Sequence, residues 1–169
     1  MESFPQTGIL SANPIANVQS GYAFTSHTGE MTSAGITEAP ALLVLNPDGS
    51  KISVVSFSRK LTAITKNKNI IFRYYFNPVV TANGTLTDTN NLFVNDGSEG
   101  IPIAKAKVYL NPTVSSKGIH ITTTVVQNAT QTTDVPLIID DGAAFLVTVQ
   151  TESIGDQFNF DFLHYEARE

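Results

Sequence analysis

The chain contains no cysteine, and this absence excludes several kinds of chemistry. A disulfide framework, a thiol nucleophile and a cysteine-ligated metal are all impossible. Charge is also scarce, because only 15% of the 169 residues are Asp, Glu, Lys or Arg, against about a quarter in typical soluble domains. The fold must therefore rest on core packing and oligomerisation. The scarcity of charge indicates a surface that is partly covered by a partner, and a threonine-rich exposed β-surface is the alternative explanation.

A basic stripe, a long apolar run and an N-terminal leader are missing as well. The net charge is −5, and the nearest approach to a basic cluster, Lys66-Asn67-Lys68, is typical of a solvated turn. We expect no nucleic-acid partner, because such binding requires a basic surface that displaces counterions. No apolar run approaches the length of a membrane span, and the first residues lack both parts of a signal peptide. The sequence thus predicts a protein made in a cytoplasm, with no membrane partner.

Strand signals are dense from Ala41 onward, whereas apolar residues never recur at helical spacing over three turns. Residues 119–127 alternate clearly between two faces, and so does the final strand, where Phe158, Phe160, Phe162 and His164 share one face. The other expected strands are 41–46, 51–58, 61–65, 69–76, 86–94, 103–110, 135–139 and 143–151. Eight to ten short strands separated by turn clusters predict an all-β sandwich or barrel.

Residues 1–38 differ from the rest of the chain. They are rich in Ser, Thr, Gly, Asn and Gln, and neither helical nor strand periodicity persists across them. We expect an extended N-terminal arm at 1–38, followed by a β-sandwich domain at 39–169. The arm's isolated apolar residues would dock into pockets on its own domain or on a neighbour, and a flexible leader with one short strand is the alternative. These candidate partner-binding residues are Phe4, Ile9, Leu10, Ile15, Val18, Tyr22 and Phe24.

A bulky apolar residue followed by Asn and Pro recurs three times, as Leu45-Asn46-Pro47, Phe76-Asn77-Pro78 and Leu110-Asn111-Pro112. Proline cannot donate to a ladder and favours extended geometry in the residue before it, so each copy ends a strand. The last two copies extend from Tyr75 to Gly84 and from Tyr109 to Gly118. A solenoid would give such a spacing, but the intervals hold two to three strands with unequal loops. We therefore interpret the copies as equivalent strand–turn corners of one sandwich.

No pattern in the sequence indicates a catalytic, cofactor or metal site. His27, His120 and His164 lack ligand spacing, so a zinc site is not expected, and no Gly-x-Ser-x-Gly elbow marks a serine nucleophile. The acidic stretches near Asp88 and Asp96 invite a calcium interpretation, although the same residue types are what tight turns require. We expect a protein that is not an enzyme and has no cofactor, and an ion in the Asp96 loop stays open.

Several stretches resemble small virion proteins of tailed bacteriophages, namely capsid decoration (cement) and head-fibre proteins. They are Leu42-Leu43-Val44-Leu45-Asn46-Pro47, Phe72 to Thr85, Val114-Ser115-Ser116-Lys117-Gly118 and Ile138 to Val149. The resemblance covers the chain from about Ala41 to the C-terminus and implies a jelly-roll or related β-sandwich. We therefore expect an all-β fold, an antiparallel jelly-roll sandwich preceded by the arm.

The resemblance also implies a function. It indicates a non-enzymatic decoration protein that binds the major capsid protein on the outer capsid surface of the virion, as a homotrimer, and stabilises the shell. The alternative is a receptor- or glycan-binding module of a fibre or tail, for which Tyr22, Tyr109 and Tyr165 are candidate contacts. A β-sandwich hydrolase is a third possibility, which no motif supports.

Overall fold

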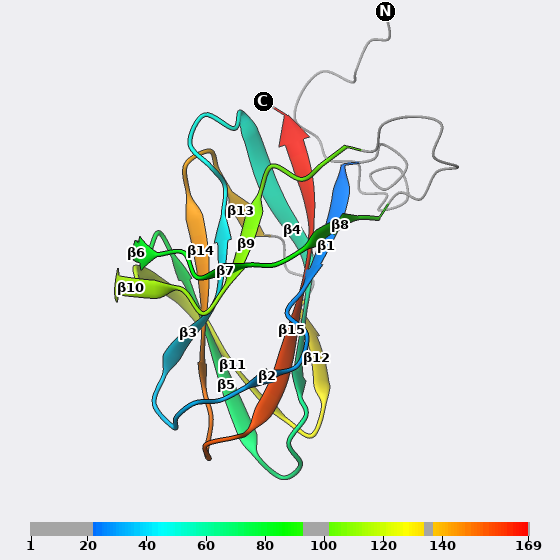
Figure 1. Cartoon of the computed structure of the whole chain (residues 1–169). Coiled ribbons are helices and arrows are strands. Elements are labelled where there is room, and N and C mark those ends of the chain that lie inside the picture. Colours follow the sequence, from blue (N-terminus) through cyan, green and yellow to red (C-terminus); the bar gives the residue numbers. More distant parts are fainter. Residues whose placement is uncertain (1–21, 93–101, 134–136, 169) are drawn as a thin grey trace, which may run out of the picture.

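The computed structural model describes residues 22–92, 102–133 and 137–168, and all regular structure within them is β (Figure 1). The strands are β1 (Ala23–His27), β2 (Met31–Thr32), β3 (Ala39–Leu45), β4 (Ile52–Ala63), β5 (Asn69–Phe76), β6 (Val79–Ala82), β7 (Thr85–Leu86), β8 (Thr89–Asn91), β9 (Lys107–Leu110), β10 (Thr113–Ser116), β11 (Ile119–Gln127), β12 (Thr130–Thr133), β13 (Leu137–Ile139), β14 (Ala144–Gln150) and β15 (Gln157–Arg168).

These strands form two packed sheets and one small extra sheet. Sheet A has the order β12-β4-β15-β1-β8, with β13 also paired to β4 and β2 to β15. Sheet B has the order β11-β5-β14-β3-β9-β7, and sheet C pairs β10 with β6. All the strand pairs are antiparallel. Figure 1 shows sheets A and B face to face, with sheet C standing out from sheet B.

The order of pairing is that of a jelly roll. Early strands pair with late strands: β1 pairs with β15, and β3 pairs with β14. The inner strands then nest within them: β4 lies between β15 and the β12–β13 edge, and β5 lies between β14 and β11. Successive strands therefore cross between the sheets, except from β5 to β11, which lie side by side in sheet B. The structure confirms the all-β sandwich and its jelly-roll topology.

Aromatic and branched side chains fill the space between the sheets. In β15 the alternation places Phe158, Phe160 and Phe162 in the core, each at most 4% exposed. From sheet B, Phe72 packs against Phe158 edge-on, with ring centroids 5.9 Å apart, while Phe145 stacks near Phe162 at 6.3 Å. Strands with one buried and one outer face explain the period of two in the sequence.

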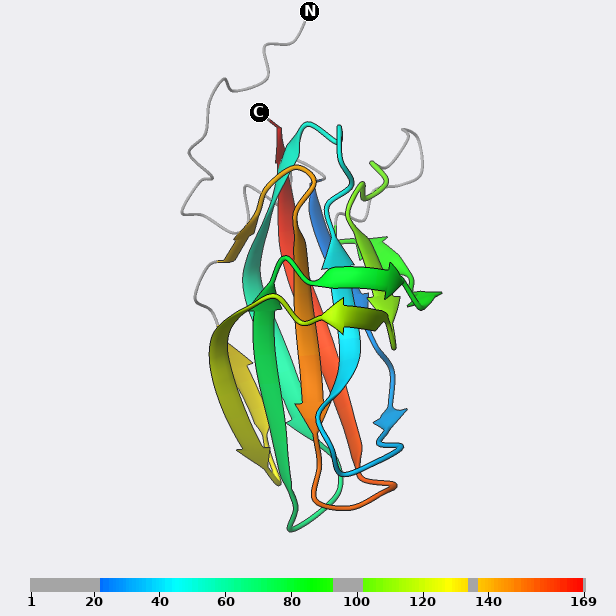
Figure 2. The ribbon, with the colours of Figure 1, turned by 90° about the vertical axis from the view of Figure 1, so that its left-hand side faces the viewer.

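An insertion between β5 and β11 makes the two flanks of the sandwich unequal. It contains β6 to β10. Within it, β8 extends sheet A beyond β1, and β9 and β7 extend sheet B beyond β3. The opposite flank, formed by β11, β12 and β13, receives no such strand among the described residues and lies at the left of Figure 2.

Three expectations about the elements need correction. The expected breaks between 51–58 and 61–65 are wrong, because β4 runs unbroken from Ile52 to Ala63. The sandwich also begins before residue 39, since β1 and β2 pair with β15 and belong to sheet A. Finally, Asn77 and Asn111 are not extended before their prolines but have φ of 50° and 52°. Asparagine tolerates this left-handed region, which lets the chain turn sharply out of sheet B.

Candidate binding surface

The predicted arm residues fall into two groups. Phe4, Ile9, Leu10, Ile15 and Val18 lie outside the described residues. Tyr22 and Phe24 lie within them. Tyr22 is half-buried, and its carbonyl accepts a hydrogen bond from the backbone N–H of Glu166 at 3.0 Å. Phe24 is only 1% exposed in β1, so it belongs to the core of its own domain and cannot contact a neighbour.

The second and third Asn-Pro copies form one unit, which we call the crossed corners (residues 75–84 and 109–118). Their strands β6 and β10 pair with each other as sheet C, which runs crosswise over the outer face of sheet B in Figure 2. Each copy is anchored alike, because the N–H groups of Asn77 and Asn111 donate to the carbonyls of Ala144 and Ala41, both at 2.9 Å. The two copies thus leave sheet B in the same way and then meet.

Contacts inside the crossed corners are reciprocal. Thr81 Oγ1 donates to the carbonyl of Thr113 at 3.1 Å, and Ser115 Oγ at the equivalent position donates to the carbonyl of Val79 at 3.4 Å. The two glycines are also reciprocal, because each lies close to the backbone of the other copy. A Cβ on Gly84 would lie 2.1 Å from the Leu110 carbonyl oxygen, and one on Gly118 would lie 2.1 Å from that of Phe76. The interpretation as equivalent strand–turn corners did not include this contact, in which the two copies pack against each other.

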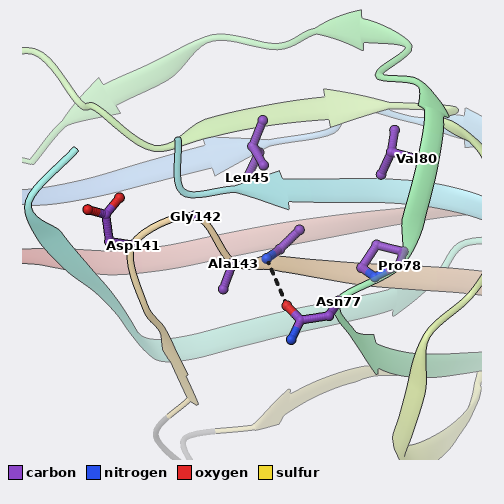
Figure 3. A pocket seen from close by; sticks show the side chains of 8 residues that line it. Leu45, Asn77, Pro78, Val80, Asp141, Gly142 and Ala143 are labelled. Carbon is purple, nitrogen blue, oxygen red and sulfur yellow. Dashed lines mark hydrogen bonds between the residues drawn. The ribbon is translucent and has the colours of Figure 1, made fainter. Parts of the chain in front are cut away.

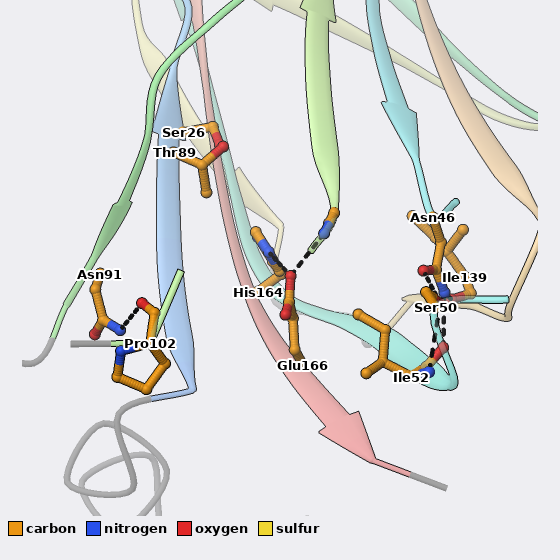
Figure 4. A network of polar contacts seen from close by, with 11 residues as sticks. Ser26, Asn46, Ser50, Ile52, Thr89, Asn91, Pro102, Ile139, His164 and Glu166 are labelled. Atoms are coloured by element: carbon orange, nitrogen blue, oxygen red, sulfur yellow. Dashed lines mark hydrogen bonds and ion pairs between the residues drawn. The ribbon is translucent and has the colours of Figure 1, made fainter. Parts of the chain in front are cut away.

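The first Asn-Pro copy has a different role. Asn46 is fully buried, and its Nδ2 donates to the carbonyls of Ile52 at 2.7 Å and Ile139 at 3.0 Å. Its Oδ1 accepts from Ser50 Oγ at 2.7 Å (Figure 4). One side chain, placed just after β3, therefore satisfies backbone carbonyls at the start of β4 and the end of β13.

An outer-face network on sheet B joins Glu38, Arg73, Tyr75, Lys117 and Thr148. Glu38 Oε1 accepts from Tyr75 Oη at 2.8 Å and Thr148 Oγ1 at 2.6 Å, while Oε2 lies 2.8 Å from Lys117 Nζ and 3.5 Å from Arg73 Nη1. Burial opposes ionisation of Glu38, but these hydrogen bonds and the Lys117 charge outweigh it and lower its pKa to about 2.

The network ties the crossed corners to the sheet. Lys117, near the end of the 109–118 corner, also lies over the ring of Tyr75 at 5.8 Å, and the His120 ring is 5.2 Å from Tyr75. Arg73 donates from Nη2 to Gln150 Oε1 at 3.0 Å. Arg73 is therefore paired on both sides within the fold. No local pattern in the sequence indicates Glu38, because its four partners come from three distant segments: β5, β14 and the residue Lys117.

The third feature is an uncharged flank, which we define as β11, β12 and β13. Residues 118–133 contain no Asp, Glu, Lys or Arg. Four large apolar side chains on this flank are exposed: Ile119 at 70%, Ile121 at 41%, Val125 at 55% and Ile138 at 56%. The predicted alternation along 119–127 is interrupted, because a register shift between His120 and Thr122 brings His120, expected on the opposite face, within 3.0 Å of Thr123 Oγ1. Exposed apolar side chains on a flank without charge favour an interaction surface.

A shallow hollow of about 510 Å³ lies near the first crossed corner, lined in part by Leu45, Pro78, Val80 and Asp141 (Figure 3). The Asp141 carboxylate is already occupied, since it accepts from the backbone N–H groups of Ser50 and Lys51. Burial opposes its ionisation, but these hydrogen bonds lower its pKa. The hollow therefore offers apolar contact and few free polar groups.

A buried polar pair lies between the sheets. His164 is fully buried, with Phe24 and Phe162 rings 5.5 and 5.3 Å away. Its Nε2 is 3.8 Å from Glu166 Oε1, which accepts from the N–H of Ala106 at 2.8 Å (Figure 4). Burial raises the pKa of Glu166, but the nearby His164 ring and the backbone N–H groups of Lys105 and Ala106 reverse this and lower it. The Glu166 carboxylate thus holds the segment just before β9 against β15.

The residues considered for metal binding remain apart. Within residues 22–92, 102–133 and 137–168, no three His, Asp or Glu side chains are grouped to hold an ion. Asp96 lies outside the described residues. Asp140 and Asp141 form the turn before β14, where the Asp140 carbonyl accepts from the N–H of Ala143 at 3.0 Å.

In the described part of the chain, no helix is long and apolar enough to cross a membrane.

No family model matches the chain, and no curated protein matches it.

Tyr165 is no longer a candidate glycan contact, because it is only 6% exposed and stacks on Phe57 at 4.1 Å. The uncharged flank, the crossed corners and the outer-face network are thus the surface features on which a functional proposal can be built.

Proposed function

We propose that the chain is a non-enzymatic structural protein of a tailed-bacteriophage virion. It binds the major capsid protein on the outer surface of the shell as a homotrimer and stabilises the particle. One observation carries this proposal: the insertion covers one flank of the jelly roll, while the other flank exposes apolar side chains and carries no charge from 118 to 133. A surface of this composition suits permanent burial in an assembly.

The polar clusters support binding rather than catalysis. The carboxylates of Glu38, Asp141 and Glu166 all accept hydrogen bonds from within the protein. Each holds segments together that are distant in sequence. Carboxylates engaged in this way stabilise the fold and are not available as a general base.

The arm supplies the proposed contact with the shell. Phe4, Ile9, Leu10, Ile15 and Val18 precede β1, and apolar side chains spaced along a segment are suited to preformed pockets on a partner. Phe24 is excluded from this role by its burial in β1. The proposed arm contact is therefore confined to residues before the sandwich.

The test uses capsids of the phage that carries this gene, assembled without the protein. Purified protein is added, and bound protein is measured after sedimentation, together with the temperature at which the shells release DNA. We expect saturable binding in groups of three and a higher release temperature, and saturation with unlabelled protein should block uptake of labelled protein. Absence of binding, or binding that leaves the release temperature unchanged, would contradict the proposal.

A glycan-binding module is the second candidate, favoured by the hollow near Asp141. Its described lining is Leu45, Asn77, Pro78, Val80 and residues 141–144, and none of these side chains is aromatic. Sugar sites typically use an aromatic face together with free polar groups, so the decoration function is preferred. Glycan-array binding by a protein with no capsid affinity would reverse this preference.

A further inference from the structure

The uncharged flank has unpaired main-chain groups in both sheets. In sheet B, β11 pairs with β5 along one edge, and in sheet A, β12 pairs with β4 along one edge. Among the described residues, no strand pairs with the other edge of β11 or β12. Two open edges of one sandwich lie about 10 Å apart. The flank therefore offers two different rows of hydrogen-bonding groups to a neighbour.

The edge at β12 is short, with four residues, whereas the long edge at β11 has only a bulge between His120 and Thr122 as protection. Proteins blunt such edges with lysine, proline, a covering loop or a very short strand. β11 spans Ile119–Gln127 and contains neither proline nor a charged residue. Its sequence is instead rich in β-branched residues, which favour strand pairing. An open, long and uncharged edge is expected to be covered in the functional protein.

The charge distribution favours further copies of this chain as the cover of the flank. Each copy has a net charge of −5, so two copies repel each other through most of their surfaces. Charges act over about 8 Å in physiological salt, and the flank carries none from 118 to 133. A strongly charged partner would find no opposite charge there. Two flanks can meet without placing like charges opposite each other.

We propose that copies of this chain associate through the uncharged flank, with β11 of one copy facing β12 of the next. This inference rests on the proposed trimer for its closure, because a ring of three needs two different edges on each copy, and the flank supplies both. The exposed Ile119, Ile121 and Val125 are then buried between subunits.

Cross-linking tests this arrangement directly, since the natural chain has no cysteine. Thr123→Cys places a thiol on β11 and Gln131→Cys places one on β12, both at exposed positions. With a short bismaleimide, we expect the double variant to give covalent trimers and each single variant to remain monomeric on a denaturing gel. Covalent dimers from Thr123→Cys alone would show two-fold β11 pairing, and they would overturn the proposed ring. Monomers from the double variant would also overturn it.

Introducing a charge into the flank by substitution provides a second test, with the dissociation of the oligomer as the measurement. Val125→Lys would bury an unpaired charge at each interface, and we expect it to raise the concentration for half-dissociation at least about tenfold. Ile154→Lys is the matched control, because Ile154 is 74% exposed in the turn between β14 and β15, outside the flank. It should leave the native mass unchanged. Circular dichroism verifies that both variants fold. Equal native masses for Val125→Lys and the wild type would contradict the inference.

The two proposals fail in different ways. A monomeric protein that still occupies capsids and stabilises them would overturn the flank interface and leave the decoration function standing. A trimer cross-linked as expected that binds no capsid would support the flank interface and overturn the decoration function.

Discussion

At the scale of single residues, Glu38 shows how one carboxylate can organise a surface. Its two oxygens receive hydrogen bonds or ion pairs from four other side chains on sheet B and the crossed corners. The folded state therefore favours the ionised form, and the pKa falls from 4.5 to about 2. A carboxylate with a lowered pKa stabilises the fold above its unfolded pKa, and this contribution disappears as the pH falls through the folded value.

We predict that Glu38→Gln lowers the free energy of unfolding by about 1–2 kcal/mol at pH 7, after allowance for solvent screening. The difference from wild type should shrink as the pH falls below 4.5 and vanish near pH 2. Urea unfolding at a series of pH values measures it. Glu152→Gln is the control, because this exposed carboxylate lies 3.9 Å from Lys68, and it should change stability by less than about 0.5 kcal/mol. A Glu38→Gln effect that stays constant between pH 7 and pH 2 would refute this account.

At the scale of elements, the crossed corners depend on two glycines. Gly84 has a φ of +88°, and a Cβ there would meet the Leu110 backbone at 2.1 Å, closer than any real contact. Gly155 has the same φ, but nothing lies within 4 Å of its added Cβ. Alanine substitutions at Gly84 and Gly155 therefore separate the cost of a left-handed backbone from the cost of a steric clash with a neighbouring backbone.

We predict that Gly155→Ala costs about 1–2 kcal/mol, the usual penalty for a left-handed alanine. Gly84→Ala should cost at least about 2 kcal/mol more, because β6 must also move away from the Leu110–Asn111 backbone. The free energy of unfolding from urea titration measures both. Equal losses in the two variants would mean that the reciprocal packing does not constrain the corners.

The elements also show how far the sequence could predict this fold. Local alternation was sufficient for the aromatic face of β15, because a period of two is a property of the strand itself. It failed in β11, where the register shifts between His120 and Thr122. The crossed corners were missed as a unit. Their repeat is visible in the sequence, yet the pairing of β6 with β10 is a contact between distant segments. The open flank was hidden for the same reason, since the apolar residues of 119–127 do not show whether another strand or sheet covers them.

At the scale of the whole molecule, the boundary of the arm decides how it can be tested. The expected boundary at residue 38 would place β1 and β2 in the arm, but both pair with β15. Removing residues 1–38 would therefore take away Phe24 and Met31, which are buried at 1% and 9% exposure. It would also remove Glu38 from the outer-face network. The sandwich thus requires the chain from about Tyr22 onward.

We predict that a chain lacking residues 1–21 keeps the cooperative unfolding transition of the full chain, while a chain lacking residues 1–38 does not fold. Deleting β1 exposes the core at β15 and costs several kcal/mol, comparable with the whole stability of a domain. Circular dichroism during urea titration distinguishes the two truncations. On capsids, the shorter truncation should reduce retention at least about tenfold, since each lost apolar anchor contributes about 1.5–3 kcal/mol. Unchanged occupancy by the folded 22–169 chain would overturn the arm contact, and it would assign shell binding to the sandwich itself.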